Sequence, residues 1–288
     1  MRILIPGGDG MLGHELLRVL GRTHEIRVTL RRELAAYADS GFFHSGNAYT
    51  GIDIRNPESL RASFEDFRPQ AVINAVGVVK QRPDAADSIS SITINALFPH
   101  QLAQLCSDYS SRLVHMSTDC VFSGDRGGYK EEDFTDAKDL YGRSKILGEL
   151  REDHCVTLRT SIIGRELSRK TGLLEWFLAQ QGPVKGYRRA VFSGFTTTEM
   201  ARIIERLLIE HPNASGLYHV SSEPIAKYDL LATIKRLFGL RIEILPDESV
   251  RIDRSLDSSR FRADLDYTPP TWTEMIQEIA ENNPVVTT

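Results

Sequence analysis

The sequence predicts an α/β protein built on a doubly wound parallel sheet of the Rossmann type, and three observations support this. Residues Arg2–Pro6 form an apolar stretch of strand length that runs directly into a glycine-rich turn. Apolar segments of strand length then alternate with amphipathic helical segments up to residue 163. The chain of 288 residues is also long enough for a second, smaller portion. We therefore expect a Rossmann domain over 1–163 and an α/β portion over 164–288 that packs on it and is partly interleaved with it.

The composition is that of a soluble globular protein, and it argues against several classes of function. There are 35 basic and 39 acidic residues, so the net charge of −4 gives no reason to expect nucleic acid. No apolar run approaches the roughly 20 residues that span a bilayer, and the amino terminus lacks the apolar core of a signal peptide. Three cysteines without Cys-x-x-Cys spacing and eight scattered histidines predict neither disulfides nor zinc. We expect a cytoplasmic protein without metal or membrane partners, with a homodimer left open.

The glycine-rich turn has the spacing Gly7-x-x-Gly10-x-x-Gly13, and leucines at helical spacing follow it. Glycines permit a tight turn and a close backbone approach, and the amino terminus of the helix offers N–H groups to a pyrophosphate. A plain tight turn is the alternative, but the order of strand, turn and helix favours a dinucleotide. We predict cofactor contacts from Gly7, Gly10, Met11, Leu12 and Gly13.

The second strand, expected over Ile26–Leu30, is followed at once by Arg31 and Arg32. An acidic residue in this position would bind the ribose hydroxyl of NAD, whereas an arginine accepts the 2′-phosphate of NADP. The two arginines therefore favour NADPH over NAD, although paired arginines are also common on solvated loops. Residues 33–51 are expected to form an irregular connection. Asp53 and Ile54, at the end of a short strand, are expected beside the adenine, and a helix cap is the alternative for Asp53.

Three later segments are expected to complete the cofactor side of the sheet. The buried strand Ala71–Gly77 ends in small residues, which let a cofactor lie against the backbone. A helix is expected over Ile92–Leu105, and the strand after it delivers polar residues to its carboxyl end, where ligands bind in open parallel sheets. The predicted cofactor contacts on these segments are Asn74, Ala75, Val76, Asn95 and Ser117.

Tyr141 and Lys145 are four residues apart on a predicted helix and therefore lie on one face of it. A free phenol has a pKa of about 10, and a neighbouring ammonium lowers the pKa, which makes the tyrosine a usable acid or base. Thr118, at the end of the preceding strand, would offer its hydroxyl to a reacting carbonyl oxygen. We predict Thr118, Tyr141 and Lys145 as the catalytic residues, with Tyr141 and Lys145 also contacting the cofactor.

Taken together, these motifs resemble the extended short-chain dehydrogenase/reductase family over roughly the first 165 residues. Within that family the chain is most similar to the dTDP-4-dehydrorhamnose reductases. The segments that carry this likeness are Ser117–Gly124, Tyr129-x-Glu131, Tyr141–Glu149 and Arg159–Ser161.

The resemblance implies reduction by NADPH of the C4 keto group of a 4-keto-6-deoxy sugar carried on a nucleoside diphosphate. Tyr141 would donate a proton, Lys145 would lower its pKa and bind the nicotinamide ribose, and Thr118 would bind the carbonyl oxygen. Dehydratases of the same superfamily carry Asp-Glu after the threonine, because removing the C5 proton needs a carboxylate. Here Cys120 takes the place of that glutamate, which favours reduction over elimination.

The expected substrate is dTDP-4-dehydrorhamnose or a UDP-linked 2-acetamido-2,6-dideoxy-4-hexulose, because several presumed pocket positions depart from the reductase pattern. Such an activity would serve deoxysugar and polysaccharide biosynthesis. Two alternatives stay open: a nucleotide-sugar epimerase with tightly bound NAD, and a non-catalytic NADP-binding regulatory subunit. Any one candidate substrate residue could equally be an ordinary surface or packing residue. These candidates are Lys80, Asp119, Cys120, Tyr187, Arg188, Phe195, Thr196 and Arg254.

Overall fold

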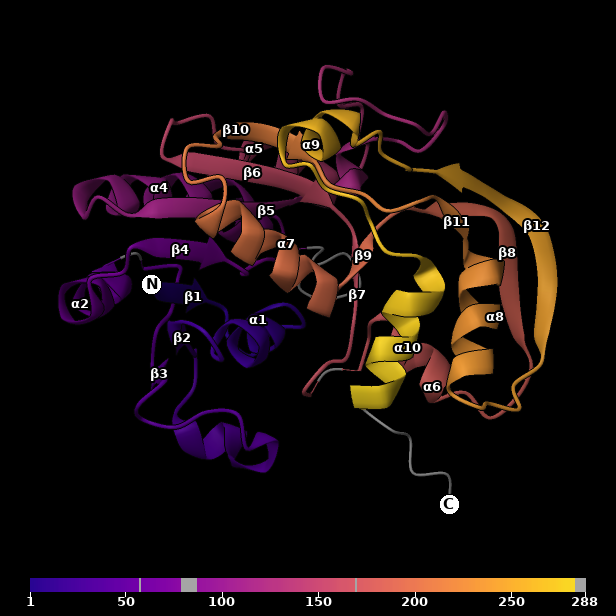
Figure 1. Ribbon diagram of the computed structural model, residues 1–288, viewed down its shortest axis with the longest axis horizontal. Helices are drawn as coiled ribbons and strands as arrows, with labels where there is room; N and C mark the ends of the chain where they lie inside the picture. Colours follow the sequence, from indigo (N-terminus) through magenta and orange to yellow (C-terminus); the bar gives the residue numbers. More distant parts are fainter. Residues whose placement is uncertain (57, 79–86, 169, 283–288) are drawn as a thin grey trace.

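A seven-stranded, fully parallel sheet forms the centre of the molecule (Figure 1). The computed structural model describes residues 1–56, 58–78, 87–168 and 170–282. In the strand order β10-β6-β5-β4-β1-β2-β3, every neighbouring pair is parallel. The strands are β1 (Arg2–Pro6), β2 (Glu25–Thr29), β3 (Ala48–Tyr49), β4 (Ala71–Asn74), β5 (Arg112–Thr118), β6 (Cys155–Thr160) and β10 (Gly216–His219).

Helices cover both faces of this sheet, so each face carries its own apolar core. Ile3 and Ile5 of β1 belong to one core and Leu4 to the other, as the period of two along a strand requires. The first core includes side chains of α1 and α7, and the second includes those of α2 and α4. The helices beside the sheet are α1 (Gly13–Leu20), α2 (Glu58–Phe67), α3 (Ser88–Ser91), the π-helix η3 (Ile92–Leu97), α4 (Phe98–Asp108), α5 (Leu140–Leu147) and α7 (Thr197–Ile209).

A smaller sheet, β11-β8-β12, stands at the side of the molecule away from β3 and β4 (Figure 1). Its two long strands run parallel, and α8 packs against β8. A two-stranded sheet of β7 and β9 connects the two larger sheets. The remaining elements are η1 (Leu34–Ser40), η4 (Asp119–Val121), β7 (Ile162–Ile163), α6 (Leu173–Leu178), β8 (Val184–Phe192), β9 (Phe195–Thr196), β11 (Ile225–Ala226), α8 (Lys227–Leu237), β12 (Ile244–Asp253), α9 (Ser259–Asp264) and α10 (Trp272–Asn282).

The predicted fold class is confirmed, and the structure adds detail that the sequence pattern lacks. The connection over 33–51 contains η1 and the edge strand β3, so Asp53 follows a strand instead of ending one. Residues 183–198, a polar and aromatic stretch in the sequence, contain β8 and β9. Strand β10 lies beyond residue 164 and pairs with β6 in the main sheet. The division of the chain at residue 163 stays a prediction. No described helix is long and apolar enough to cross a membrane.

Candidate active site

The candidate active site lies at the carboxyl end of β5, where Thr118 ends the strand. The Thr118 hydroxyl accepts a hydrogen bond from Cys120 N at 3.1 Å and donates one to Asp119 Oδ1 at 3.2 Å. Thr118 thereby caps the 3-10 turn η4 that follows the strand. Thr118 and Asp119 are each only 6% exposed, so the turn holds both side chains in a nearly closed site.

Helix α5 carries Tyr141 against this turn. Asp139 caps the helix by accepting a hydrogen bond from Gly142 N at 2.8 Å. A side chain at Gly142 would overlap the carbonyl oxygen of Cys120, so only glycine lets the first turn of α5 pack this closely on η4. In this arrangement the Tyr141 phenol lies close enough to the Thr118 side chain for Thr118 to lower the pKa of the phenol. The structure therefore brings the predicted acid and the predicted carbonyl-binding hydroxyl together.

The ionisation of Tyr141 and Lys145 differs from the prediction. Burial raises the pKa of Tyr141, and the nearby Cys120 raises it further, whereas the predicted effect was a lowering by Lys145. Lys145 Nζ instead donates a hydrogen bond to the carbonyl oxygen of Met116 at 2.6 Å. Burial lowers the pKa of Lys145 to about 8. At neutral pH Tyr141 therefore keeps its proton, and Lys145 is mostly charged.

Asp119, Cys120 and Arg254 gather beside Thr118, and their contact with a substrate stays a prediction. Burial raises the pKa of Asp119, and burial followed by the Asp119 charge raises the pKa of the Cys120 thiol to about 12. The Arg254 charge opposes both changes, which places its guanidinium close to the two side chains. Arg254 Nε donates a hydrogen bond to the carbonyl oxygen of Phe122 at 2.8 Å. A thiol with so high a pKa is not a ready base, which supports reduction over elimination.

Two of the predicted substrate residues, Phe195 and Thr196, are wrong because both are fully buried. Phe195 packs edge-on against Tyr267 in the core that α1 and α7 share. Thr196 caps α7 by accepting a hydrogen bond from Glu199 N at 3.3 Å. A side chain that protein covers completely cannot touch a substrate, so both residues have structural roles.

The other predicted substrate residues lie elsewhere. Tyr187 and Arg188 are on β8 in the smaller sheet, where the Arg188 guanidinium stacks 4.8 Å from the centre of the Tyr228 ring. Their contact with a substrate stays a prediction. Lys80 lies outside the described residues.

The turn between β1 and α1 fits a dinucleotide pyrophosphate. Gly7 has a φ of +86°, and a side chain there would press on Ala75 and Val76 at the end of β4. A side chain at Gly13 would overlap the carbonyl oxygen of Gly7. The turn is therefore a cradle that glycines keep open, and the first N–H groups of α1 have no partner within the helix. Met11 and Leu12 belong to the same turn, with the Leu12 side chain in the core.

The two arginines after β2 are exposed at the carboxyl edge of the sheet, where a 2′-phosphate would lie. The Arg32 guanidinium stacks 5.5 Å from the centre of the Tyr37 ring, and the Arg31 charge acts on Asp53. Asp53 forms an ion pair with Arg55, which holds the pKa of Asp53 at about 2. Ile54, the second residue expected beside the adenine, packs partly buried against the core that α2 and α4 share.

The buried side chains of Asn74 and Asn95 support the segment that leaves β4, and their contact with a cofactor stays a prediction. Asn74 is 0% exposed, and its amide bonds Val76 N at 3.1 Å and His115 Nδ1 at 3.1 Å. Asn95 is 1% exposed, and its amide bonds both backbone groups of Val78. Both amides therefore hold the segment that follows β4 in place. Ala75 and Val76 belong to this segment and lie on the side where the cofactor is predicted.

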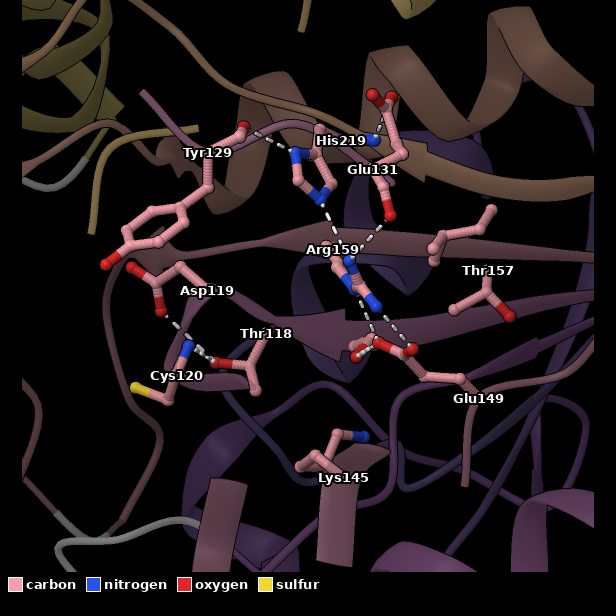
Figure 2. A network of polar contacts seen from close by, with 12 residues as sticks. Thr118, Asp119, Cys120, Tyr129, Glu131, Lys145, Glu149, Thr157, Arg159 and His219 are labelled. Atoms are coloured by element: carbon pink, nitrogen blue, oxygen red, sulfur yellow. Dashed lines mark hydrogen bonds and ion pairs between the residues drawn. The ribbon is translucent and has the colours of Figure 1, made fainter. Parts of the chain in front are cut away.

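A buried polar network beside the catalytic residues was not predicted from the sequence (Figure 2). Glu149, just beyond α5, accepts hydrogen bonds from Ser117 Oγ at 2.7 Å and from Arg159 Nε at 2.7 Å. Arg159 also donates to His219 Nε2 at 3.1 Å. The available signal was an arginine inside β6, a fully buried strand without any other charged residue, because a buried charge needs a partner.

Comparison with known proteins agrees with this geometry. The family model described as "RmlD substrate binding domain" matches residues 1–284. The dTDP-4-dehydrorhamnose reductase of Aggregatibacter actinomycetemcomitans is 25% identical over 245 residues, 81% of this chain and 78% of that one. The dTDP-4-keto-6-deoxy-D-glucose reductase of Streptomyces niveus is 29% identical over 264 residues, 86% of this chain and 84% of that one.

A solved structure of similar fold is dTDP-4-dehydrorhamnose reductase from Bacillus anthracis in complex with NADP. Its TM-score is 0.81 at 21% identity, over 98% of this chain and 99% of that one. These relatives are reductases by name, which agrees with the predicted oxidoreductase class. A family model that matches nearly the whole chain confirms the resemblance that the motifs indicated. The chain belongs to the RmlD substrate-binding domain family.

Proposed function

We propose that the protein is an NADPH-dependent reductase of the C4 keto group of a nucleoside-diphosphate 4-keto-6-deoxy sugar. The observation that carries this proposal is the meeting of Thr118 and Tyr141 at the end of β5, with Lys145 one helical turn away. The glycine cradle on the same sheet supports a dinucleotide in reach of these groups. The names of the family relatives support nucleotide sugars as the substrate class.

Three side chains share the proposed reaction. NADPH supplies the hydride that reduces the carbonyl carbon when it is bound. Tyr141 keeps its proton at neutral pH because burial raises its pKa, and it donates that proton to the carbonyl oxygen as negative charge develops there. Thr118 hydrogen-bonds the same oxygen and orients it. Lys145 adds positive charge on the helix face that carries Tyr141.

The substrate is proposed to be of the dTDP-4-dehydrorhamnose or UDP-2-acetamido-2,6-dideoxy-4-hexulose type, in deoxysugar supply for a polysaccharide. Arg254 supports a diphosphate substrate, because its guanidinium lies near the partly enclosed turn of Asp119 and Cys120. Asp119 is expected to hydrogen-bond the sugar, and Cys120 to contact it. Tyr187 and Arg188 are proposed to make only outer contacts with the substrate.

The decisive experiment measures NADPH oxidation with a panel of dTDP-linked and UDP-linked 4-keto-6-deoxy sugars. We expect turnover with at least one member and product reduced at C4, identified by NMR. No turnover with any of them would refute the proposed function. An epimerase would instead purify with bound NAD and convert sugars without added NADPH.

The cofactor preference is predicted to depend on Arg31 and Arg32. Replacing both with alanine is expected to raise the KM for NADPH about tenfold to a hundredfold, because charge-assisted bonds to the 2′-phosphate are lost. The KM for NADH should change little, because NADH lacks that phosphate. Steady-state kinetics with both cofactors measure this, and Arg241→Ala is the control. Equal loss with NADH would contradict the proposed role.

We further propose a cytoplasmic homodimer. The three cysteines are free, which suits a reducing compartment. Support for the dimer comes from the packed helices α3, η3 and α5, which expose Ile89, Ile92 and Leu97 together with Leu147, itself 64% exposed.

Leu147→Glu is expected to convert a dimer to a monomer, because it places a charge in the apolar interface. Light scattering after size-exclusion chromatography measures the mass. Ile209→Glu, at the exposed last position of α7, is the matched control and should leave the dimer intact. A wild-type protein that is monomeric at micromolar concentration would contradict the dimer.

A further inference from the structure

Glu149 pairs with Arg159, the central residue of the buried network beside the active site (Figure 2). Its carboxylate accepts hydrogen bonds from Arg159 Nε at 2.7 Å and Arg159 Nη2 at 2.8 Å, which is a bidentate ion pair. It also accepts from Ser117 Oγ at 2.7 Å. The side chains of Arg159 and Glu149 are 4% and 12% exposed, so both charges are largely removed from water.

These contacts connect the two elements that carry the catalytic residues. Ser117 is the residue before Thr118 on β5, and Glu149 follows α5, which carries Tyr141 and Lys145. The bond from Ser117 to Glu149 therefore fixes the end of the strand relative to the end of the helix. The two residues are 32 positions apart in the sequence, so this hydrogen bond joins the two ends of the segment between them.

The other end of the network holds that intervening segment in place. Arg159 Nη1 donates to His219 Nε2 at 3.1 Å, and His219 Nδ1 donates to the carbonyl oxygen of Tyr129 at 2.9 Å. His219 N also donates to Glu131 Oε1 at 2.9 Å. Burial and the Arg159 charge lower the pKa of His219 to about 4, so the ring is neutral and can accept from Arg159.

We propose that Glu149 is a positioning residue for the catalytic helix, holding α5 on the Thr118 strand and placing a negative charge one turn from Lys145. Arg159 completes the unit by holding the carboxylate in place. This inference rests on the proposed reductase function and adds to it the residue that sets the charge state of Lys145.

The charges around Lys145 support this role. Burial lowers the pKa of Lys145, and the Glu149 charge opposes this shift, which leaves the pKa at about 8. His115 of β5 also faces Lys145, but burial lowers its pKa well below the usual range, so that ring stays neutral. Tyr141 is neutral as well, because burial raises its pKa. Without the Glu149 charge, Lys145 should lose its proton at a lower pH.

The test reads the Lys145 titration directly and needs no substrate. The sequence has eight lysines, so the Nζ signal of Lys145 can be followed by NMR and assigned with Lys145→Arg. Wild-type protein should titrate with a midpoint near 8. Glu149→Gln should titrate at lower pH. Glu149→Asp keeps the charge and should stay near the wild-type midpoint.

Glu199→Gln is the matched control, because Glu199 is also buried and pairs with Arg202 and the Tyr267 hydroxyl. It should leave the Lys145 midpoint unchanged. If Glu149→Gln does not fold, Arg159→Met replaces it: this variant keeps the Glu149 charge and removes the opposing Arg159 charge, so the Lys145 midpoint should move to higher pH. A Lys145 midpoint in the folded variant equal to that of wild type overturns the inference.

Kinetics separate this inference from the proposed function. If wild-type protein reduces a keto sugar, the alkaline limb of its kcat/KM profile should move to lower pH in Glu149→Gln. In Glu149→Asp the limb should stay, while kcat falls because the shorter side chain releases Ser117. If wild-type protein reduces no keto sugar, the proposed function fails, and the NMR titration still decides the charge role of Glu149.

Discussion

Replacing Tyr141 with phenylalanine is expected to lower kcat for keto-sugar reduction by roughly 10²–10⁴-fold, the usual contribution of a positioned general acid. The substitution removes only the phenolic oxygen, which contacts the Thr118 side chain. The ring remains to fill the same space between α5 and the turn after β5. NADPH binding, measured by fluorescence titration, should therefore be retained, because the glycine cradle is untouched.

The control for this variant is Tyr109→Phe, a tyrosine at the end of α4 whose hydroxyl contacts Glu65 at 3.3 Å, away from the Thr118 turn and from the glycine-rich turn. It should keep turnover close to that of wild type. Keto-sugar turnover that survives in Tyr141→Phe would show that another group donates the proton. A wild-type protein that binds NADPH but turns over no keto sugar would favour a non-catalytic, NADP-binding role.

The first half of the fold could be predicted because its information is local. Strands β1, β2, β4, β5 and β6 are short stretches with several apolar residues, and the helices between them show apolar residues at helical spacing, whereas the two-residue strand β3 was not predicted. Pairing between distant strands is not local, so the position of β10 beside β6 could not be read from the residues of β10. Strand β8 was missed because its middle is polar, with Lys185, Arg188 and Arg189 exposed, and because its buried positions include the small residues Gly186 and Ala190.

The candidate catalytic residues could be proposed from the sequence because each has a distinctive side chain at a fixed spacing. Tyr141 and Lys145 lie four residues apart on one helix, and Thr118 ends a strand, so the chemistry is visible in the sequence. Phe195 and Thr196 show the limit of this approach. An aromatic and a hydroxyl residue suit a sugar pocket and a buried cap equally well, and only their complete burial decides between these roles.

The sequence does not show which residues pair with the buried charges. Glu149 and Arg159 are ten positions apart on different elements, and no helical or strand period relates them. Their meeting depends on the place of β6 beside β5, which brings the Arg159 side chain to the level of Ser117. The raised pKa of Tyr141 also depends on the folded structure, because its main cause is burial. The sequence alone led to the opposite expectation, that Lys145 would lower this pKa.

Replacing Arg159 with methionine is expected to lower the free energy of unfolding by about 3–5 kcal/mol, because it leaves the Glu149 carboxylate buried without its cation. The two side chains are 4% and 12% exposed, so water cannot replace the lost partner. The His219 ring also loses the donor to its Nε2. Urea denaturation followed by circular dichroism measures the change at neutral pH.

The matched control is Arg206→Met, which removes an ion pair of nearly the same length on the surface. Arg206 and Glu210 lie 2.8 Å apart, but their side chains are 34% and 54% exposed. Solvent screening limits such a pair to about 0–1 kcal/mol. The double variant E149M/R159L should recover much of the loss, since an apolar pair of similar volume replaces both charges. An equal decrease in the free energy of unfolding in Arg159→Met and Arg206→Met would contradict this prediction. It would mean that the buried Glu149–Arg159 pair stabilises the fold no more than a surface ion pair does.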